Sequence, residues 1–317
     1  MKSETLNICQ VSLAGNIPII RENIKNFENF YNNVFFYIIV PEKELNLFRK
    51  KIRNKNVKFI SENNLIKFNK FKRIANSFFK KHRYYNQIQH RLTWYYQQIL
   101  KISFIIDFVN KNNQNIIIWD ADTIIIEKIK FFDKKKSIKY GTTSYFHKAY
   151  YYTNKKILKK LPKYYISSLY QFINLSVTDQ KFLKKKLGIT YLKGNPSLNI
   201  SKRIMRAIGD SHKNYNGSMF SEYELVGQSN LLLQYSKQKL ISGIRDWLDG
   251  ILTENQIKIL KILGFKYVAY EHTHPHPLSK NMLKRNQTWL RFFGLLIKKM
   301  SNNFFRGIRH HLNYLIN

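Results

Sequence analysis

Two aspartates separated by a single residue are the clearest chemical signal in the sequence. Asp120 and Asp122 follow the apolar run Ile116–Trp119 and precede a second apolar run, Thr123–Ile126. Carboxylates at the carboxyl end of a buried strand lie where open α/β sheets bind their ligands. Oxygen ligands suit Mg²⁺ and Mn²⁺, and Mg²⁺ commonly takes its remaining ligands from substrate phosphates. The segment therefore predicts a site for Mn²⁺ or Mg²⁺ that binds a diphosphate.

The structural alternative is a pair of surface aspartates in an ordinary turn. The flanks Ile116–Trp119 and Thr123–Ile126 are both apolar, which predicts that the turn between them is at least partly buried. Buried carboxylates are costly unless a cation or a basic group neutralises them. The cation site is therefore the favoured interpretation.

The preceding sequence alternates strand-like and helix-like segments. Three strands are expected at Leu6–Leu13, Val34–Val40 and Val57–Ile60. The segments between them have helical character, one from Pro18 to about Asn32 and a charged one that ends near Arg53. This β-α-β-α-β order predicts an α/β fold with a mostly parallel sheet and helices on both faces.

A long helix is expected from Asn86 to Val109, just before the strand that carries the aspartates. Its apolar stripe consists of Leu92, Tyr95, Ile99, Ile102 and Ile106. The opposite face carries Trp94, Gln97, Gln98 and Lys101, and Arg91 lies one turn earlier. A lysine on this face can offer a point charge to a diphosphate, and the amides can bond base, ribose or sugar hydroxyls. The alternative is an ordinary solvated helix face.

Composition indicates a folded protein with an unusual charge. Of 317 residues 44% are hydrophobic, and 55 Lys and Arg against 19 Asp and Glu give a net charge of +36. A compositional bias toward Lys, attraction to anionic lipid and binding to nucleic acid would each produce such a charge. The single cysteine, Cys9, excludes an internal disulfide and is expected to be a buried, inert thiol. Without a signal-peptide pattern or a membrane-spanning run, a reducing, cytoplasmic location is expected.

Three blocks in fixed order resemble a known family. The blocks are Trp94–Lys101, Asp120–Thr123 and Ser221–Gly227, with the patterns WYxQQxxK, DADT and SEYEL. They are similar to the signatures of bacterial glycosyltransferase-like proteins from surface-polysaccharide loci, which have the nucleotide-diphospho-sugar transferase (GT-A, Rossmann-like) fold. The resemblance implies a metal-dependent transferase with a nucleotide-diphosphate sugar as donor. It implies a saccharide, often lipid-linked, as acceptor in capsule, lipooligosaccharide or O-antigen synthesis.

Two carboxylates are candidates for the base that would activate an acceptor hydroxyl. Ser221 can cap a helix, and Glu224 three residues later fits a capping box, which leaves Glu222 as the freer carboxylate. Asp179 is the other candidate. A positioned carboxylate near the sugar could remove the hydroxyl proton in an inverting displacement. Inversion and retention both stay open.

Three histidines alternate with other residues in the segment His272–Pro277. In several GT-A enzymes a late histidine completes the metal site, so the resemblance makes His272 or His274 a candidate metal ligand. A proline-rich surface loop is the alternative, and the spacing does not match a closed zinc site.

The last residues predict a basic amphipathic helix. Its apolar face would consist of Leu290, Phe293, Ile297, Met300, Phe304 and Ile308. Its basic face would consist of Arg291, Lys298, Lys299, Arg306 and Arg309. This pattern is typical of a helix in a membrane interface, here an anionic one, although a helix docked on the protein's own core has a similar pattern.

The expected organisation has three parts. Residues 1–200 would form the nucleotide-sugar-binding core, residues 201–280 would complete the acceptor side, and residues 281–317 would form the helical tail. The protein would act on the inner face of the bacterial cytoplasmic membrane, with no nucleic-acid partner.

Two other functions are open. A nucleic-acid-binding protein would account for the charge but gives the aspartate pair no role. A phosphatase of the haloacid-dehalogenase type also uses two aspartates after a strand. Its pattern, however, places a glycine between the second aspartate and the threonine, whereas Thr123 directly follows Asp122.

Overall fold

A five-stranded sheet forms the centre of the protein. The computed structural model describes residues 5–80, 85–142, 147–163, 166–189, 195–211, 218–233, 237–245, 252–270, 292–294, 296–297 and 300. The strands of the sheet are β1 (Leu6–Val11), β2 (Val34–Val40), β3 (Val57–Ser61), β4 (Ile116–Trp119) and β9 (Phe172–Leu175). Their order is β3-β2-β1-β4-β9, and only β9 is antiparallel to its neighbour.

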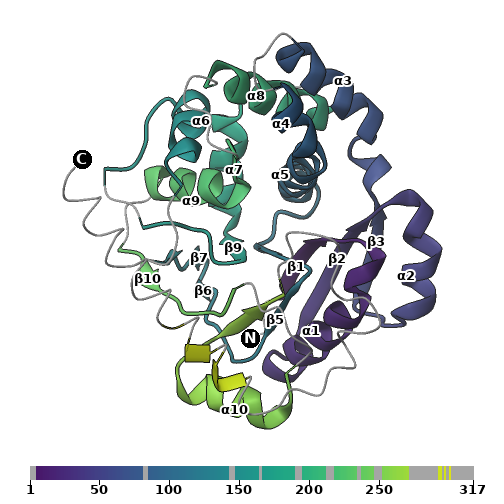
Figure 1. The fold of residues 1–317 in the computed structure, drawn as a ribbon, viewed down its shortest axis with the longest axis vertical. Helices are drawn as coiled ribbons and strands as arrows, with labels where there is room; N and C mark the ends of the chain where they lie inside the picture. Colours follow the sequence, from purple (N-terminus) through teal and green to yellow (C-terminus); the bar gives the residue numbers. More distant parts are fainter. Residues whose placement is uncertain are drawn as a thin grey trace.

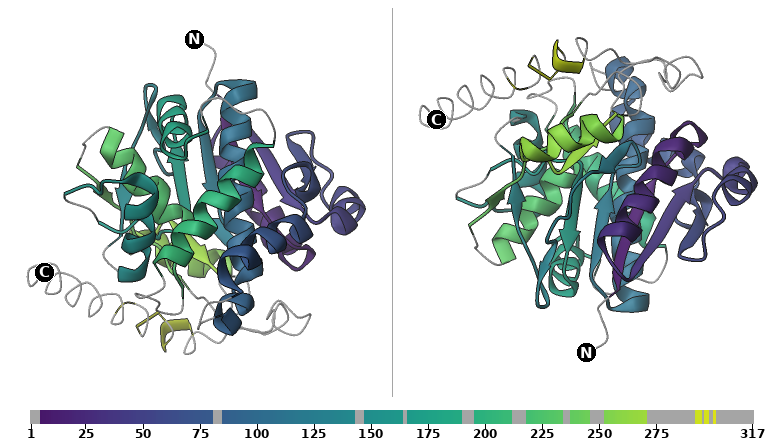
Figure 2. Two further views of the ribbon diagram at one scale, coloured as in Figure 1. Left: turned by 90° about the horizontal axis from the view of Figure 1, so that it is seen from above. Right: turned by 90° about the horizontal axis from the view of Figure 1, so that it is seen from below.

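Helices cover both faces of the sheet, because the strands are apolar on both sides (Figure 1). One face packs against α1 (Ile17–Phe30) and α2 (Leu45–Lys51). The other face packs against a group of helices around α5, seen from two further directions in Figure 2. That group consists of α3 (Phe68–Phe79), α4 (Tyr85–His90), α5 (Leu92–Asn112), α6 (Lys148–Leu158), α7 (Val177–Lys186), α8 (Pro196–Asp210) and α9 (Glu222–Leu233).

A smaller unit extends one side of the molecule. Strand β5 (Thr123–Ile125) leaves the main sheet and pairs antiparallel with β11 (Tyr267–Ala269). Helix α10 (Glu254–Ile262) packs beside them around a third apolar core that includes Phe292 and Leu296. The remaining elements are β6 (Phe132–Asp133), β7 (Lys136–Ser137), β8 (Tyr140–Gly141), β10 (Lys239–Leu240) and the short 3-10 helices Ala14–Asn16, Glu42–Glu44 and Glu62–Asn64.

The structure confirms the predicted fold class and most of its first half. The α/β architecture, its mostly parallel sheet and the flanking helices are as expected. The helix expected from Asn86 to Val109 is interrupted at Arg91, which separates α4 from α5. The expected boundary near residue 200 falls inside α8. No helix in the described parts of the chain has the length and apolar character needed to cross a membrane.

The alternative of an ordinary solvated helix face does not hold for two residues of this long helix. Helix α5 lies between the sheet and the other helices of its layer, so that almost every side of it is covered. Gln98 and Lys101 are only 2% and 3% exposed. The sequence periodicity separates the polar from the apolar side chains correctly, but the polar side chains meet another helix rather than solvent.

Candidate active site

The candidate site lies where the connections of the sheet change direction. From β1 the chain continues to β2 and then β3 on one side, and later returns to β4 on the other side of β1. At such a point the loops that follow the two central strands separate, which creates the usual ligand crevice of an open α/β sheet. Asp120 is the first residue after β4. Asp120 therefore lies at the carboxyl end of a strand, where the sequence pattern predicts it.

The turn Asp120–Thr123 is fixed by hydrogen bonds on all sides. The Thr123 amide donates to the Asp120 carbonyl at 3.1 Å, and the Trp119 indole donates to the Thr123 carbonyl at 2.8 Å. The Asp122 carbonyl accepts from the Tyr270 amide at 2.8 Å. Trp119 itself is fully buried. The backbone between the two carboxylates is thus held rigidly, and the two aspartate side chains stay partly exposed.

A buried lysine joins the two acidic segments of the site. The Lys101 ammonium donates to Asp120 Oδ1 and, at 2.6 Å, to Glu222 Oε1. It also donates to the Tyr223 hydroxyl at 3.3 Å and lies 4.7 Å from the centre of the Tyr223 ring. The structure therefore brings together Lys101, Asp120, Asp122 and Glu222, which the sequence places in three separate blocks.

Helix α5 recognises the beginning of α9 through residues spaced three apart. The Tyr95 hydroxyl accepts from the Met219 amide at 3.2 Å. One turn later the Gln98 Oε1 accepts from the Glu222 amide at 3.1 Å, and after another turn Lys101 binds the Glu222 carboxylate. Amides at a helix start have no partner within the helix, so Gln98 acts as a cap supplied by a second helix. The first sequence block, on α5, thus binds the start of the third block, at the beginning of α9.

The charges of this cluster do not balance. Asp120, Asp122 and Glu222 contribute three carboxylates, against the one ammonium of Lys101. Burial and the neighbouring Asp120 carboxylate raise the pKa of Asp122 to about 7. Burial also raises the pKa of Glu222, although Lys101 opposes this effect. Burial by itself would lower the pKa of Lys101, but the Asp120 and Glu222 carboxylates outweigh it and raise this pKa.

The donor set fits a divalent cation with only two protein ligands. Asp120 and Asp122 offer carboxylate oxygens from one turn, and their mutual repulsion is expressed in the raised pKa of Asp122. A hard cation between them would remove that repulsion. Among the residues that the structure describes, no three His, Cys, Asp or Glu side chains are grouped to hold a metal ion. His272 and His274 lie outside the described residues.

Asp179 is not part of this cluster. It caps the start of α7, where its carboxylate accepts from the Ser176 amide and hydroxyl, and it pairs with Lys139 at 2.7 Å. Because β9 runs antiparallel to β4, the residues after β9 lie near Asn115, at the opposite end of β4 from Asp120. The structure does not bring this candidate base to the aspartate turn.

The other candidate donor-binding residues lie at the start of α5, with Arg91 just before its first turn. Arg91 is exposed and its guanidinium lies 5.8 Å above the Trp94 ring. Trp94 and Gln97 are half-buried. At about 1.5 Å per residue, Trp94 lies about 10 Å along the helix from Lys101 and Arg91 about 15 Å. These three side chains are accessible, unlike Gln98 and Lys101.

The sequence analysis gave no role to two residues of the cluster, although Tyr223 lies within the third sequence block. Tyr223 contacts Lys101, and its hydroxyl donates to the Gln171 carbonyl at 3.3 Å. The same carbonyl accepts from the Asp120 amide at 3.0 Å. A contact made by a backbone carbonyl is independent of residue type, so only the tertiary structure reveals Gln171.

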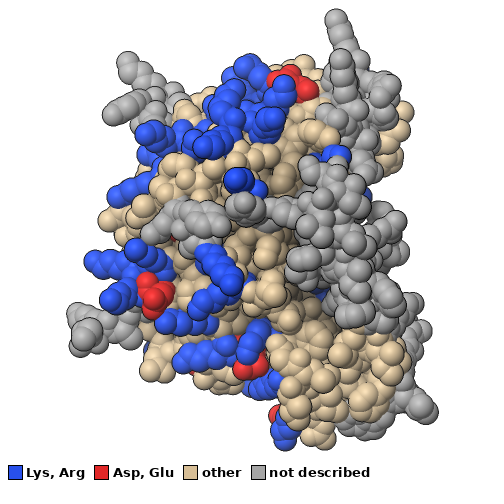
Figure 3. All heavy atoms as spheres, turned by 90° about the vertical axis from the view of Figure 1, so that its left-hand side faces the viewer, with Lys and Arg blue, Asp and Glu red and all other residues tan. Residues whose placement is uncertain are grey.

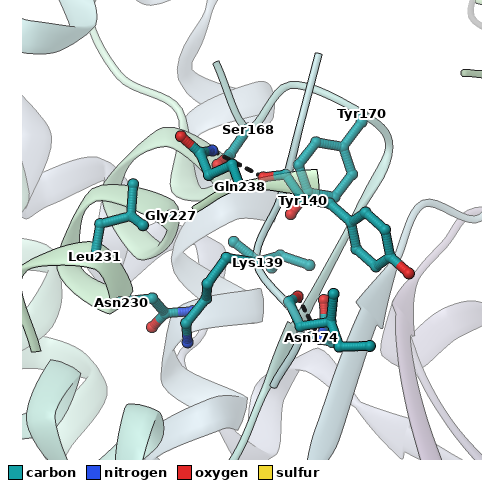
Figure 4. Close-up of a pocket in the computed structure, with 11 residues that line it drawn as sticks. Lys139, Tyr140, Ser168, Tyr170, Asn174, Gly227, Asn230, Leu231 and Gln238 are labelled. Carbon is teal, nitrogen blue, oxygen red and sulfur yellow. Dashed lines mark hydrogen bonds between the residues drawn. The ribbon is translucent and has the colours of Figure 1, made fainter. Parts of the chain in front are cut away.

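A small internal hollow lies farther along α9 (Figure 4). Its lining includes Lys139, Asn174 and Asn230, and no protein partner within the described residues contacts the side-chain oxygens of the two asparagines. Its volume of about 10 Å³ is about the space that one water molecule needs. The hollow is therefore too small for a sugar.

Comparisons with known proteins place the chain in a family. No curated protein matches the sequence. Among solved structures, the chain matches the apo crystal structure of mouse xyloside xylosyltransferase 1 with a TM-score of 0.41 and 8% identity, over 84% of this chain and 97% of that chain. Residues 13–245, which contain the whole Lys101–Glu222 cluster, match the model of a family of unknown function, DUF6492. Because the match spans more than half of the chain, this protein is a member of the DUF6492 family.

Proposed function

We propose that this protein is a metal-dependent glycosyltransferase that uses a nucleotide-diphosphate sugar as donor. The observation that carries the proposal is the excess of carboxylates over ammonium groups at the carboxyl ends of β1 and β4. Such a site repels a diphosphate in the absence of a cation but attracts a divalent cation strongly. A bound cation reverses the local charge and attracts the diphosphate.

The two aspartates are the proposed protein ligands of Mn²⁺ or Mg²⁺. When bound, the cation would neutralise charge on the departing diphosphate and orient it. Lys101 is proposed to act on the diphosphate indirectly, since Asp120 and Glu222 already occupy its ammonium. His272 or His274 is the proposed third ligand.

Glu222 is the proposed base for an acceptor hydroxyl. Lys101 occupies one of its carboxylate oxygens, and burial raises its pKa toward the range in which a carboxylate accepts a proton efficiently at neutral pH. The shared contact of Glu222 and Asp120 with Lys101 supports this proposal, because Asp120 is a proposed ligand of the cation. The proton of the acceptor hydroxyl would move to Glu222 as the sugar is transferred.

The accessible first turns of α5 are the proposed contact for the rest of the donor. Arg91, Trp94 and Gln97 offer a cation, a ring face and an amide, which suit the phosphate, base and hydroxyl groups of a nucleotide sugar. From the sequence resemblance we propose a saccharide acceptor, lipid-linked, in the synthesis of a bacterial surface polysaccharide.

The decisive experiment is a thermal-shift screen of nucleoside diphosphates with and without Mn²⁺. Binding at 100 times Kd stabilises the native state by about 2.7 kcal/mol. We expect at least one nucleoside diphosphate to raise the Tm by several degrees only when Mn²⁺ is present, and Asp122→Asn to abolish the shift. The absence of any Mn²⁺-dependent shift would refute the proposed function.

The two alternatives predict different results in the same samples. Release of inorganic phosphate from simple phosphomonoesters, lost in Asp120→Asn, would support the phosphatase. Tight RNA binding at physiological salt that Asp120→Asn leaves unchanged would support a nucleic-acid-binding protein. On the face shown in Figure 3, Lys and Arg side chains are spread in several separate groups rather than in one continuous stripe. The described part of this face therefore lacks the continuous basic stripe that a nucleic-acid groove would show.

We also propose that the C-terminal segment contacts an anionic membrane. Phe292 and Leu296 are buried against the third core, whereas Phe293, Ile297 and Met300 are 44%, 66% and 43% exposed. The spacing of the exposed three places them on one side of a helix. The segment thus docks through one apolar edge and leaves a second one open, in a stretch whose sequence is strongly basic. Such a surface suits acidic lipid headgroups.

A further inference from the structure

We infer that the Tyr223 hydroxyl and the Gln171 carbonyl are positioning groups that hold Asp120 in a closed ring of hydrogen bonds. The inference rests on the proposed function in one respect, namely that Asp120 binds a divalent cation. The ring itself is defined by four described residues that come from α5, the end of β4, the start of β9 and α9.

Four contacts close the ring. The Lys101 ammonium donates to the Asp120 carboxylate and, at 3.3 Å, to the Tyr223 hydroxyl. The Tyr223 hydroxyl donates to the Gln171 carbonyl at 3.3 Å, and the Asp120 amide donates to the same carbonyl at 3.0 Å. Asp120 is therefore held at both its side chain and its backbone, by two routes that meet at Tyr223.

The backbone of Gln171 is strained where it serves this ring. Its φ is +68°, in the left-handed region that disfavours side chains other than glycine. The other described residues with positive φ that are not glycine are Asn113 and Lys159, which end helices, and Lys134, which lies in the turn between β6 and β7. Gln171 is buried, at 4% exposure, and precedes a strand. Strain that surrounding contacts maintain beside a candidate site indicates a functional constraint.

Tyr223 can join the two routes because a phenol hydroxyl both donates and accepts a hydrogen bond. Its hydroxyl donates to the Gln171 carbonyl and accepts from the Lys101 ammonium. Groups that orient metal ligands in this way change metal affinity by about 10- to 100-fold when they are removed.

The first test compares two tyrosines that each donate one buried hydrogen bond to a carbonyl. Tyr223→Phe removes the ring contact, whereas the control, Tyr96→Phe, removes a bond to the Ile66 carbonyl at 2.5 Å, away from the cluster. Isothermal titration with Mn²⁺ alone should show at least about tenfold weaker binding for Tyr223→Phe and less than about twofold change for Tyr96→Phe. Equal affinities in Tyr223→Phe and the wild type would overturn the inference.

A second test does not depend on any metal. Urea unfolding of the wild type, Tyr223→Phe, Asp120→Asn and the double variant measures the coupling between the two residues. The effect of Tyr223→Phe on the unfolding equilibrium constant should be at least about threefold smaller in the Asp120→Asn background. Independent effects would overturn the ring. If the wild type bound no Mn²⁺, the proposed function would be refuted. The unfolding experiment would still test whether Tyr223 and Asp120 are coupled through the ring.

The contribution of the Gln171 backbone is tested with a matched pair of variants. Gln171→Gly and Gln171→Val both remove the side chain, but only glycine adopts a φ of +68° without strain. Gln171→Gly should retain Mn²⁺ affinity within about threefold of the wild type, and Gln171→Val should lose at least about tenfold. Equal losses in both variants would show that the side chain, and not the carbonyl position, is what matters.

Discussion

Lys101 shows how the environment of a residue changes its role. On a solvated helix face its ammonium would bind an anion, as the sequence indicates. In the structure it is buried and bound by Asp120 and Glu222, so it neutralises carboxylates within the protein. The anion-binding role then passes to the cation that the remaining negative charge attracts. The site thus carries an excess of negative groups, although the net charge of the chain is +36.

Removal of the Lys101 ammonium should destabilise the protein severely. Lys101→Met leaves the buried Glu222 carboxylate and the partly exposed Asp120 carboxylate without their partner. Breaking a buried ion pair in this way typically costs about 3–5 kcal/mol. The cost should be smaller at pH 5 than at pH 7, because burial already raises the pKa of Glu222 and protonation removes its charge. Urea unfolding at the two pH values measures this.

The control for this prediction is a lysine in an exposed pair. Lys111→Met breaks the pair between Lys111 and Asp107, whose side chains are 69% and 39% exposed. Exposed pairs contribute about 0–1 kcal/mol, so this variant should unfold almost like the wild type at both pH values. Similar losses in the two variants would contradict the buried role of Lys101.

Asp122 should make the metal-free protein less stable as the pH rises. Its pKa is about 7 in the folded protein against an ordinary value of 3.8, so the native state binds more protons than the unfolded state between these values. The free energy of unfolding contributed by this group should therefore fall as pH rises from about 4 to about 7 and level off above 7. Unfolding curves in EDTA should show this slope in the wild type and lose it in Asp122→Asn.

At the scale of elements, the site depends on the contact between α5 and α9. The α5 residues Tyr95, Gln98 and Lys101 bind the segment that begins α9, and β9 supplies the Gln171 carbonyl. Asp179 belongs to a different part of the fold, the start of α7. Stability and cation binding should therefore respond differently to changes in the two regions.

Asp179→Asn tests this separation. The variant leaves Lys139 buried without its carboxylate partner and should cost about 3 kcal/mol or more of unfolding free energy. Because Asp179 lies at the far end of β4, the affinity for Mn²⁺ should stay within about twofold of the wild type. A large loss of Mn²⁺ affinity in a folded variant would return Asp179 to the candidate site.

The smaller unit depends on a close approach at Gly243. A Cβ added there would lie 2.1 Å from the Tyr267 ring, which is held in strand β11. Gly243→Ala should therefore cost about 1–3 kcal/mol through overpacking. Gly209→Ala in helix α8 is the matched control, since the nearest atom to its added Cβ would be 3.6 Å away, on Phe79. This variant should be neutral or slightly stabilising. Thermal unfolding of both variants distinguishes the two.

At the scale of the whole molecule, positive charge and an open apolar edge support membrane contact. Ile297→Glu should weaken cosedimentation with phosphatidylglycerol vesicles by about tenfold or more, because it replaces a 66% exposed apolar side chain with a negative charge. The wild-type interaction should also weaken as salt concentration increases.

The matched control for membrane binding lies on α10. Ile262 is 84% exposed but is outside the C-terminal segment, so Ile262→Glu should bind vesicles like the wild type. Equal loss in both variants would indicate a nonspecific effect of charge. Binding of wild type and Ile297→Glu with equal affinity would refute the role of the C-terminal edge.

The sequence by itself determined the order of strands and helices in the first half and the identity of the aspartate turn. Apolar periodicity is local, and a buried strand followed by two carboxylates is recognisable without its neighbours. Parallel strands joined by helices also place their carboxyl ends together, so the edge of the sheet that carries the site was predictable. Lys101 and Glu222 were singled out differently, by the resemblance of three sequence blocks to a known family and by the capping pattern at Ser221–Glu224.

Only the tertiary structure decided how those residues act. Whether Lys101 faces solvent or α9 depends on which helices cover α5, and periodicity within one helix contains no such information. The antiparallel pairing of β9 places Asp179 far from Asp120 and brings the Gln171 carbonyl beside it. The contacts of the ring join residues 19 to 122 positions apart and are fixed by packing and backbone geometry, so the ring around Asp120 could not be read from any one motif.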